Sequence, residues 1–122
     1  MVTAAQLPVS LVADEQKAIH ILLEKLVELH QGEVQQVILF GSKARGDFNA
    51  DSDTDILILV NHETWGLRNS IWSLAAQVEL SFDVIFNVQV IGVERWHQMS
   101  LERFSLCRNV ERDGITLFSR SQ

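Results

Sequence analysis

The sequence predicts an α/β domain in which helices pack on a mixed β-sheet, and three observations lead to this fold class. Amphipathic helical segments alternate with short apolar segments of strand character, an order typical of α/β proteins. The chain has 122 residues, which fits one domain and leaves no room for two separate cores. Its composition is 47% hydrophobic with one proline, as expected for a globular chain. We therefore expect residues 1–122 to form one domain, with a flexible segment at residues 1–10.

The first half of the chain contains a predicted helix and two predicted strands. Apolar residues recur at three- and four-residue spacing over residues 14–30 and predict a helix, which Gly32 ends. The segment Val34–Phe40 is apolar and β-branched, ends at a glycine, and predicts a buried strand. The segment Thr54–Val60 is nearly all apolar after its first two residues, so it predicts a second, central strand.

The second half repeats the alternation. Residues 65–78 place apolar side chains on one helical face, and residues 81–88 return to strand character. Residues 101–113 predict a further helix that stops at Gly114, and residues 115–118 predict a short final strand. The predicted order is therefore helix, strand, short turn, strand, helix, strand, helix, strand.

Composition narrows the function classes. Sixteen acidic against ten basic residues give a net charge of −6, which repels polyanions, so direct nucleic-acid binding is not expected. A small phosphorylated ligand is compatible with this negative charge if metal ions supply positive charge at its site. The start of the chain lacks a basic leader and no apolar run is long enough to cross a bilayer, so we expect a cytoplasmic protein without membrane insertion. The single cysteine, Cys107, is expected to be a buried small hydrophobe in a reducing compartment.

The segment between the first two predicted strands carries the residues most suited to chemistry. Gly41 and Ser42 close a strand and are expected to open a short helical turn, where glycine lets a ligand approach the backbone while the hydroxyl and N–H groups face it. Asp53 and Asp55 are two residues apart at the start of the next strand, so strand alternation predicts that both carboxylates share one face. Two adjacent carboxylates repel one another, and a hard divalent cation such as Mg²⁺ would relieve that repulsion.

A third aspartate, Asp83, lies in the apolar run of residues 81–88. An unpaired carboxylate is costly to bury, so Asp83 either reaches solvent at the strand end or joins a charged site. If this strand lies beside Thr54–Val60, three aspartates converge. Three carboxylates with bound Mg²⁺ would suit phosphoryl or nucleotidyl transfer.

Each of these features has a simpler explanation when it is taken alone. A Gly-Ser pair after a strand is most often a turn, and an aspartate-rich stretch is most often a solvated loop or a helix cap. Trp65 and Trp72 lie seven residues apart on one predicted helix, a spacing that suits core or partner contact equally. The four histidines show no metal-site spacing. Only the ordered set of glycine, serine and aspartates favours nucleotidyl transfer.

As a set, these residues resemble the minimal nucleotidyltransferases of the DNA polymerase beta superfamily, and within it the MntA-type antitoxins that pair with HEPN ribonuclease toxins. The family signature is Gly-Ser, ten residues and Asp-x-Asp, which residues 41–42 and 53–55 match without a gap. The longer form Gly-Ser-x-Ala-Arg-Gly is present at residues 41–46, and Asp83 fits the family's third aspartate. The resemblance extends over essentially the whole chain.

The resemblance implies a nucleotidyltransferase-type mixed β-sheet and a site for two Mg²⁺ ions and ATP. Asp53 and Asp55 would ligate Mg²⁺, and Asp83 would complete one metal site and help to deprotonate the acceptor. For Arg45, a phosphate contact and locking of the loop are equally open, and lysine stands at Lys43 where arginine is common in the family. The turn residues that would hold the nucleotide are Gly41, Ser42, Lys43 and Arg45.

The implied reaction is attack of an acceptor hydroxyl on the α-phosphorus of ATP with release of pyrophosphate. Because the chain is short for an additional acceptor-binding domain, we expect a partner to present the acceptor. The resemblance implies a tyrosine hydroxyl on a HEPN toxin, whose adenylylation silences the ribonuclease. The chain itself contains no tyrosine. Two alternatives stay open: an antitoxin that neutralises its partner by binding alone, and nucleotidyl transfer to a small molecule such as an aminoglycoside.

Overall fold

The computed structural model describes residues 11–46 and 53–120 of the chain. The expectation for residues 1–10 and the part of the motif at residues 47–52 lie outside the described residues. The helices and strands are, in chain order, α1 (Ala13–Leu29), β1 (Val34–Phe40), α2 (Ser42–Arg45), β2 (Thr54–Val60), α3 (Trp65–Phe82), β3 (Phe86–Gly92), α4 (Val93–Leu101), α5 (Ser105–Asp113) and β4 (Ile115–Ser119).

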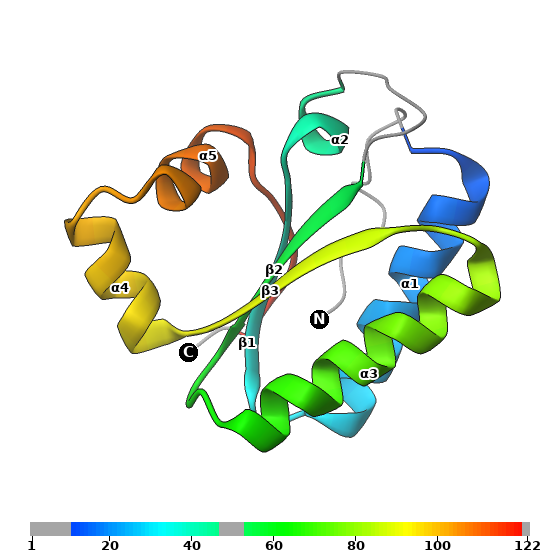
Figure 1. Ribbon diagram of the computed structural model, residues 1–122, viewed down its shortest axis with the longest axis horizontal. Helices are drawn as coiled ribbons and strands as arrows, with labels where there is room; N and C mark the ends of the chain where they lie inside the picture. Colours follow the sequence, from blue (N-terminus) through cyan, green and yellow to red (C-terminus); the bar gives the residue numbers. More distant parts are fainter. Residues whose placement is uncertain (1–10, 47–52, 121–122) are drawn as a thin grey trace.

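The strands form one mixed four-stranded sheet in the order β3-β2-β1-β4. Strand β1 pairs antiparallel with both β2 and β4, whereas β2 and β3 pair in parallel. The long helix α3 makes the crossover between the two parallel strands (Figure 1). The two central strands are the most apolar ones, because each has a covered face on both sides of the sheet. This confirms the predicted fold class of an α/β protein with a mixed sheet.

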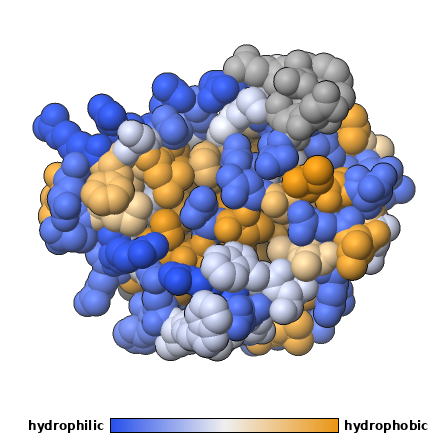
Figure 2. All heavy atoms as spheres, in the orientation of Figure 1, coloured by the Kyte–Doolittle hydropathy of each residue, from blue (hydrophilic) through white to orange (hydrophobic). Residues whose placement is uncertain are grey.

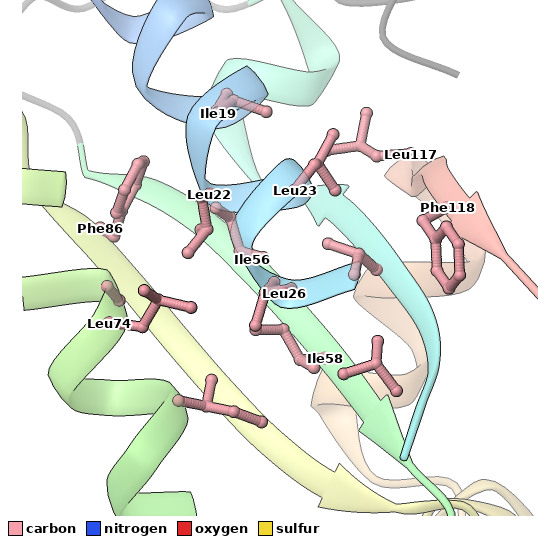
Figure 3. Packing of buried hydrophobic residues seen from close by; sticks show 14 of the residues in the cluster. Ile19, Leu22, Leu23, Leu26, Ile56, Ile58, Leu74, Phe86, Leu117 and Phe118 are labelled. Atoms are coloured by element: carbon pink, nitrogen blue, oxygen red, sulfur yellow. The ribbon is translucent and has the colours of Figure 1, made fainter. Parts of the chain in front are cut away.

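Helices cover both faces of the sheet. Helices α1 and α3 lie side by side on one face, and α4 and α5 lie on the other (Figure 1). Strand alternation divides the apolar side chains of β2 between two cores, with Ile56 and Ile58 packed under α1 and α3 and Leu57 and Leu59 on the opposite face. Figure 3 shows the larger core, in which four residues of α1 contact the sheet: Ile19, Leu22, Leu23 and Leu26.

The smaller core lies under α4 and α5. Its buried residues come from three strands and from α5, and side chains of α4 such as Trp96 and Met99 pack against them. Cys107 of α5 is buried with a free thiol, as predicted. The buried residues of this cluster are Ile38, Phe40, Leu57, Leu59, Ile91 and Val110.

Three predicted boundaries are wrong. The predicted helix 65–78 continues to Phe82, because Glu79 and Leu80 are good helix formers and the chain then turns at Asp83 in the left-handed conformation (φ 53°). The predicted strand 81–88 is displaced for the same reason and runs instead over Phe86–Gly92. The predicted helix 101–113 begins only at Ser105, and the separate helix Val93–Leu101 was not predicted.

Helix α4 contains no buried residue, so its sequence lacks the regular spacing of apolar residues from which a helix is predicted. The first two strands have the predicted bounds, the first helix is shifted by one residue at each end, and the final strand extends one residue further, to Ser119. The short helical turn expected at Ser42 is also present, as α2.

Several large apolar side chains are exposed along α3. Trp65 is 70% exposed, Trp72 is 41% exposed, and Leu80 is 87% exposed. On the face of the molecule that Figure 2 shows, hydrophobic residues are interspersed with hydrophilic ones. Within residues 11–46 and 53–120, none of the helices is long and apolar enough to cross a membrane.

Candidate active site

The candidate site lies at the edge of the sheet where β1 ends and β2 begins. Asp55 of β2 is level with Phe40, the last residue of β1, and with Asn87 near the start of β3. Because side chains alternate along a strand, Asp55 and Asn87 point to the face that α4 and α5 cover further along. Asp55 is half-buried and Asn87 is exposed. Asp53, which directly precedes β2, is exposed at the same edge.

The Asp55 carboxylate has a defined orientation between two neighbours. Its Oδ1 accepts a hydrogen bond of 2.9 Å from the side-chain Nδ2 of Asn87. Its Oδ2 lies against Gly41, so close that a Cβ atom at residue 41 would overlap it. Gly41 also has a backbone φ of 80°, a conformation that other residues rarely adopt. Glycine is therefore required at residue 41 for two reasons, the backbone conformation and the approach of Asp55.

Ser42 begins α2 directly after Gly41, and the short helix is closed by backbone hydrogen bonds. The amide of Arg45 donates to the carbonyl of Gly41 at 3.1 Å, and Gly46 caps the turn in the left-handed conformation. Ser42 is half-buried. The sequence Gly-Ser-x-Ala-Arg-Gly thus forms one compact turn between β1 and the Asp-x-Asp segment.

Beneath this turn lies a buried polar cluster that consists of Lys43, Glu15 and Thr54. The Lys43 side chain is 2% exposed, and its Nζ lies 3.1 Å from Oε2 of Glu15 on α1. The hydroxyl of Thr54, at the start of β2, donates to the same Oε2 at 3.4 Å. Glu15 also accepts from the backbone amide of Val12, so it caps α1. One carboxylate therefore connects α1, α2 and β2 directly under the candidate site.

Arg45 forms a second connection on the other side of the turn. Its Nη1 lies 3.0 Å from Oδ2 of Asp113, the last residue of α5. Arg112 also donates to Asp113 through Nε and Nη2, at 3.0 and 2.9 Å. Hydrogen bonds from Arg112, and then from Arg45, hold the pKa of the Asp113 carboxyl below its usual value, although burial opposes the shift. Of the two roles open for Arg45, this contact favours the one that locks the loop.

Asp83 does not lie on a strand, and that part of its prediction is wrong. It is the exposed C-cap of α3, three residues before β3 begins. Glu79 explains the displacement: its carbonyl accepts from Val84 N at 3.3 Å and its carboxylate accepts from Phe86 N at 2.8 Å, which ends the helix and starts the strand later. The residue beside Asp55 on the neighbouring strand is therefore Asn87. The role of Asp83 as a metal ligand stays a prediction.

The oxygen donors at this edge fit a magnesium ion. Among residues 11–46 and 53–120, no three or more His, Cys, Asp or Glu side chains form a group that could hold a metal ion. Mg²⁺, however, is usually bound through one or two carboxylates, with phosphate oxygens and water as its other ligands. Asp53 and Asp55 supply two such carboxylates beside the Gly41-Ser42 turn. The donor set suits a hard cation that binds together with a phosphorylated ligand.

Sequence reasoning missed three residues of this region. Asn87 interrupts an apolar run just as Asp83 does, but its place beside Asp55 depends on the start of β3 at Phe86, which the side chain of Glu79 sets. The pairing of Lys43 with Glu15 and of Arg45 with Asp113 joins residues 28 and 68 positions apart. Nothing in the local sequence signals such distant pairs. The side chain of Lys43 is buried against Glu15, and its contact with a nucleotide stays a prediction.

The fold and the site together define an α/β protein with two aspartates and a Gly-Ser turn at one edge of a mixed sheet. The family model of the nucleotidyltransferase domain matches residues 19–115. A protein of Methanocaldococcus jannaschii named as a candidate protein adenylyltransferase is 31% identical over 105 residues, which cover 86% of this chain and 99% of the relative. The chain therefore belongs to the nucleotidyltransferase domain family, as the sequence motif predicted, and it is a nucleotidyltransferase.

A second Methanocaldococcus jannaschii protein with the same name is 40% identical over 55 residues, 44% of this chain and 56% of the relative. Among solved structures, a chain of a toxin–antitoxin crystal structure with AMP-PNP superposes with a TM-score of 0.57 at 23% identity, covering 83% of this chain and 73% of that one. A chain from the complex of the tri-AMPylated Shewanella oneidensis HEPN toxin with MNT antitoxin gives 0.53 at 19% identity, covering 88% and 73%. These likenesses support the fold.

Proposed function

We propose that this chain is a Mg²⁺-dependent protein adenylyltransferase that transfers AMP from ATP to a tyrosine hydroxyl of a partner HEPN ribonuclease toxin, and so acts as its antitoxin in the cytoplasm. The observation that carries the proposal is the packing of the Asp55 carboxylate against Gly41, which joins the two halves of the family signature at one sheet edge. The name of the full-length relative supports protein as the acceptor class. The toxin–antitoxin complexes with a similar fold support the kind of partner.

In this proposal Asp53 and Asp55 hold Mg²⁺, and Gly41 and Ser42 face the triphosphate of ATP. Bound Mg²⁺ would neutralise phosphate charge and orient the α-phosphorus for attack. The acceptor oxygen forms a bond to that phosphorus, the bond to the β-phosphate oxygen breaks, and pyrophosphate leaves with its electron pair. The hydroxyl proton passes to a carboxylate, the role that the family resemblance gives to Asp83. Arg45 keeps the turn in place through Asp113.

Exclusion of water from the reacting phosphorus would depend on the partner, because the partner would close the site. The described edge is open, since Asp53 and Asn87 are both exposed. An open edge suits an acceptor carried on the surface of another protein, whose approach would complete the site. The net charge of −6 would favour a partner with a basic surface.

A second candidate function is neutralisation of the partner by binding alone. It is favoured by the exposed tryptophan and leucine side chains of α3, because Trp65, Trp72 and Leu80 lie within the same broad face of the helix. Tryptophan is enriched at the energetic centres of protein interfaces. In this case the aspartates would not be needed for neutralisation.

One variant separates the two functions. The double variant Asp53→Asn/Asp55→Asn keeps the size of both side chains and removes both charges. It should lose AMP transfer and neutralisation together if catalysis is required. Co-expression with the product of the neighbouring gene, followed by mass measurement of that product, gives the answer. Full neutralisation by the double variant, with an unmodified partner, would support binding alone and contradict the adenylyltransferase proposal.

A further inference from the structure

Asn87 lies beside the candidate metal ligands, and the sequence signature gives it no role. Asn87 is level with Asp55 in the parallel pair β2–β3, and its side chain shares the face of Asp55. The contact between Nδ2 and Asp55 Oδ1 is 2.9 Å long. A carboxylate is only an acceptor, so the amide nitrogen of Asn87 must be the group that faces it. Hydrogen bonds to an ionised acceptor are among the stronger and better directed ones.

We propose that Asn87 is a positioning residue that holds the Asp55 carboxylate in the orientation in which it binds a divalent cation. This inference rests on the proposed function, since that function supplies the cation. Asn87 fixes Oδ1 from one side while the Cα of Gly41 bounds Oδ2 from the other. A carboxylate offers about four lone-pair directions, so the bond to Asn87 leaves others for a metal ion. The carboxylate is thereby oriented before the ion arrives.

The chemical character of Asn87 also sets the charge of the site. The amide of Asn87 is neutral, so β3 adds no negative charge beside Asp55. The carboxylates of Asp53 and Asp55 are therefore not repelled by a further carboxylate on β3. A site with an amide at residue 87 attracts a divalent ion less strongly than the same site with a carboxylate there, so the phosphates of the nucleotide would supply part of the attraction. The inferred consequence is that the ion binds weakly alone and more tightly together with ATP.

The test measures Mn²⁺ binding to the full chain without nucleotide. Either titration calorimetry or the decrease in the electron paramagnetic resonance signal of free Mn²⁺ gives the affinity. Removing a residue that orients a metal ligand typically weakens metal binding about 10- to 100-fold. We expect Asn87→Ala to weaken Mn²⁺ binding at least about 10-fold, with an unchanged melting temperature in the absence of metal. The matched control is Gln89→Ala, two residues further along the same face of β3 and level with Leu57 instead of Asp55. This control should bind Mn²⁺ like the unmodified chain.

A second variant changes the site in the opposite direction. Asn87→Asp keeps the size of the side chain and places a third carboxylate beside Asp55, so Mn²⁺ should bind more tightly than to the unmodified chain. Equal Mn²⁺ affinity of the unmodified chain and Asn87→Ala, or no Mn²⁺ binding by either, would overturn the proposal. Its failure is separable from that of the proposed function. A chain that transfers AMP but binds Mn²⁺ independently of Asn87 contradicts only this inference, whereas Asn87-dependent binding without AMP transfer contradicts only the proposed function.

Discussion

The Asp55 carboxylate lies directly against Gly41, although the two residues stand at opposite ends of the motif. Strand pairing creates this neighbourhood, because Asp55 is level with Phe40 and Gly41 follows Phe40 at the end of β1. The two ends of the sequence signature are therefore in contact in the structure, where Gly41, which has no side chain, lies against the charged side chain of Asp55. Any side chain at residue 41 would fill the volume that Oδ2 of Asp55 occupies.

Gly41→Ala should damage both stability and the site. An alanine at φ 80° and ψ −160° would take a backbone conformation that is nearly restricted to glycine and costs about 1–3 kcal/mol, and the added methyl group must also displace Asp55. We expect a loss of more than about 2 kcal/mol in the free energy of unfolding, together with loss of metal-dependent ATP binding. Urea unfolding and titration calorimetry measure the two effects.

Gly46→Ala provides the matched control. Gly46 also has a positive φ, 85°, but with ψ 11° it lies in the less restricted left-handed helical region, and among the described residues nothing lies within 4 Å of the place where its Cβ would be. It should lose only about 1 kcal/mol and keep ATP binding. If both alanine variants lose the same stability and bind ATP equally well, the contact between Gly41 and Asp55 has no role in the site.

Replacing only one residue of the Lys43–Glu15 ion pair should lower the free energy of unfolding substantially. Lys43→Met leaves the Glu15 carboxylate buried with fewer partners, and removing one member of a buried pair typically costs about 3–5 kcal/mol. The double variant Lys43→Met/Glu15→Leu removes both charges and should recover part of that loss, although Val12 N and the Thr54 hydroxyl then lose their acceptor. A double-mutant cycle in urea tests this expectation, and additive losses in the two single variants would contradict it.

Asp113 should make stability depend on pH in the acid range. Hydrogen bonds from Arg112 and Arg45 lower its pKa in the folded protein, so the folded state binds this proton more weakly than the unfolded state does. The carboxylate therefore contributes stability at pH values above its unfolded pKa of about 3.9. This contribution is lost as the pH falls from there through the lowered folded value.

The measurement compares the free energy of unfolding of the unmodified chain with that of Asp113→Asn. The difference should stay constant between about pH 7 and pH 5 and shrink below about pH 4, while carboxylates common to both proteins cancel. Arg112→Gln removes the largest cause of the shift and should reduce the pH dependence. A difference that stays constant down to about pH 2 would show that Asp113 has an ordinary pKa.

Much of the fold could be predicted from local patterns, and the failures have a common cause. The central strands Val34–Phe40 and Thr54–Val60 are apolar on both faces and bounded by glycine or polar residues, so their limits are evident in the sequence. The end of α3 and the start of β3 depend instead on Glu79, which reaches Phe86 through its side chain. Helix α4 has no buried residue to signal it. These elements are set by tertiary contacts that local periodicity does not encode.

The candidate site shows the same division. Gly41, Ser42, Asp53 and Asp55 could be predicted because each belongs to one short segment with fixed spacing. The neighbours that fix the site come from other elements and could not be predicted: Glu15 from α1, Asn87 from β3 and Asp113 from α5.

The most direct test of the central claim is transfer of labelled phosphate from ATP to the partner protein. The chain is mixed with Mg²⁺ and the product of its neighbouring gene, once with ATP labelled at the α-phosphate and once with ATP labelled at the γ-phosphate. The account predicts label on the partner only from the α-phosphate, a mass increase of whole AMP units, and no transfer by Asp53→Asn/Asp55→Asn. Label from the γ-phosphate, or no label from a folded chain that binds Mg²⁺ and ATP, would contradict it.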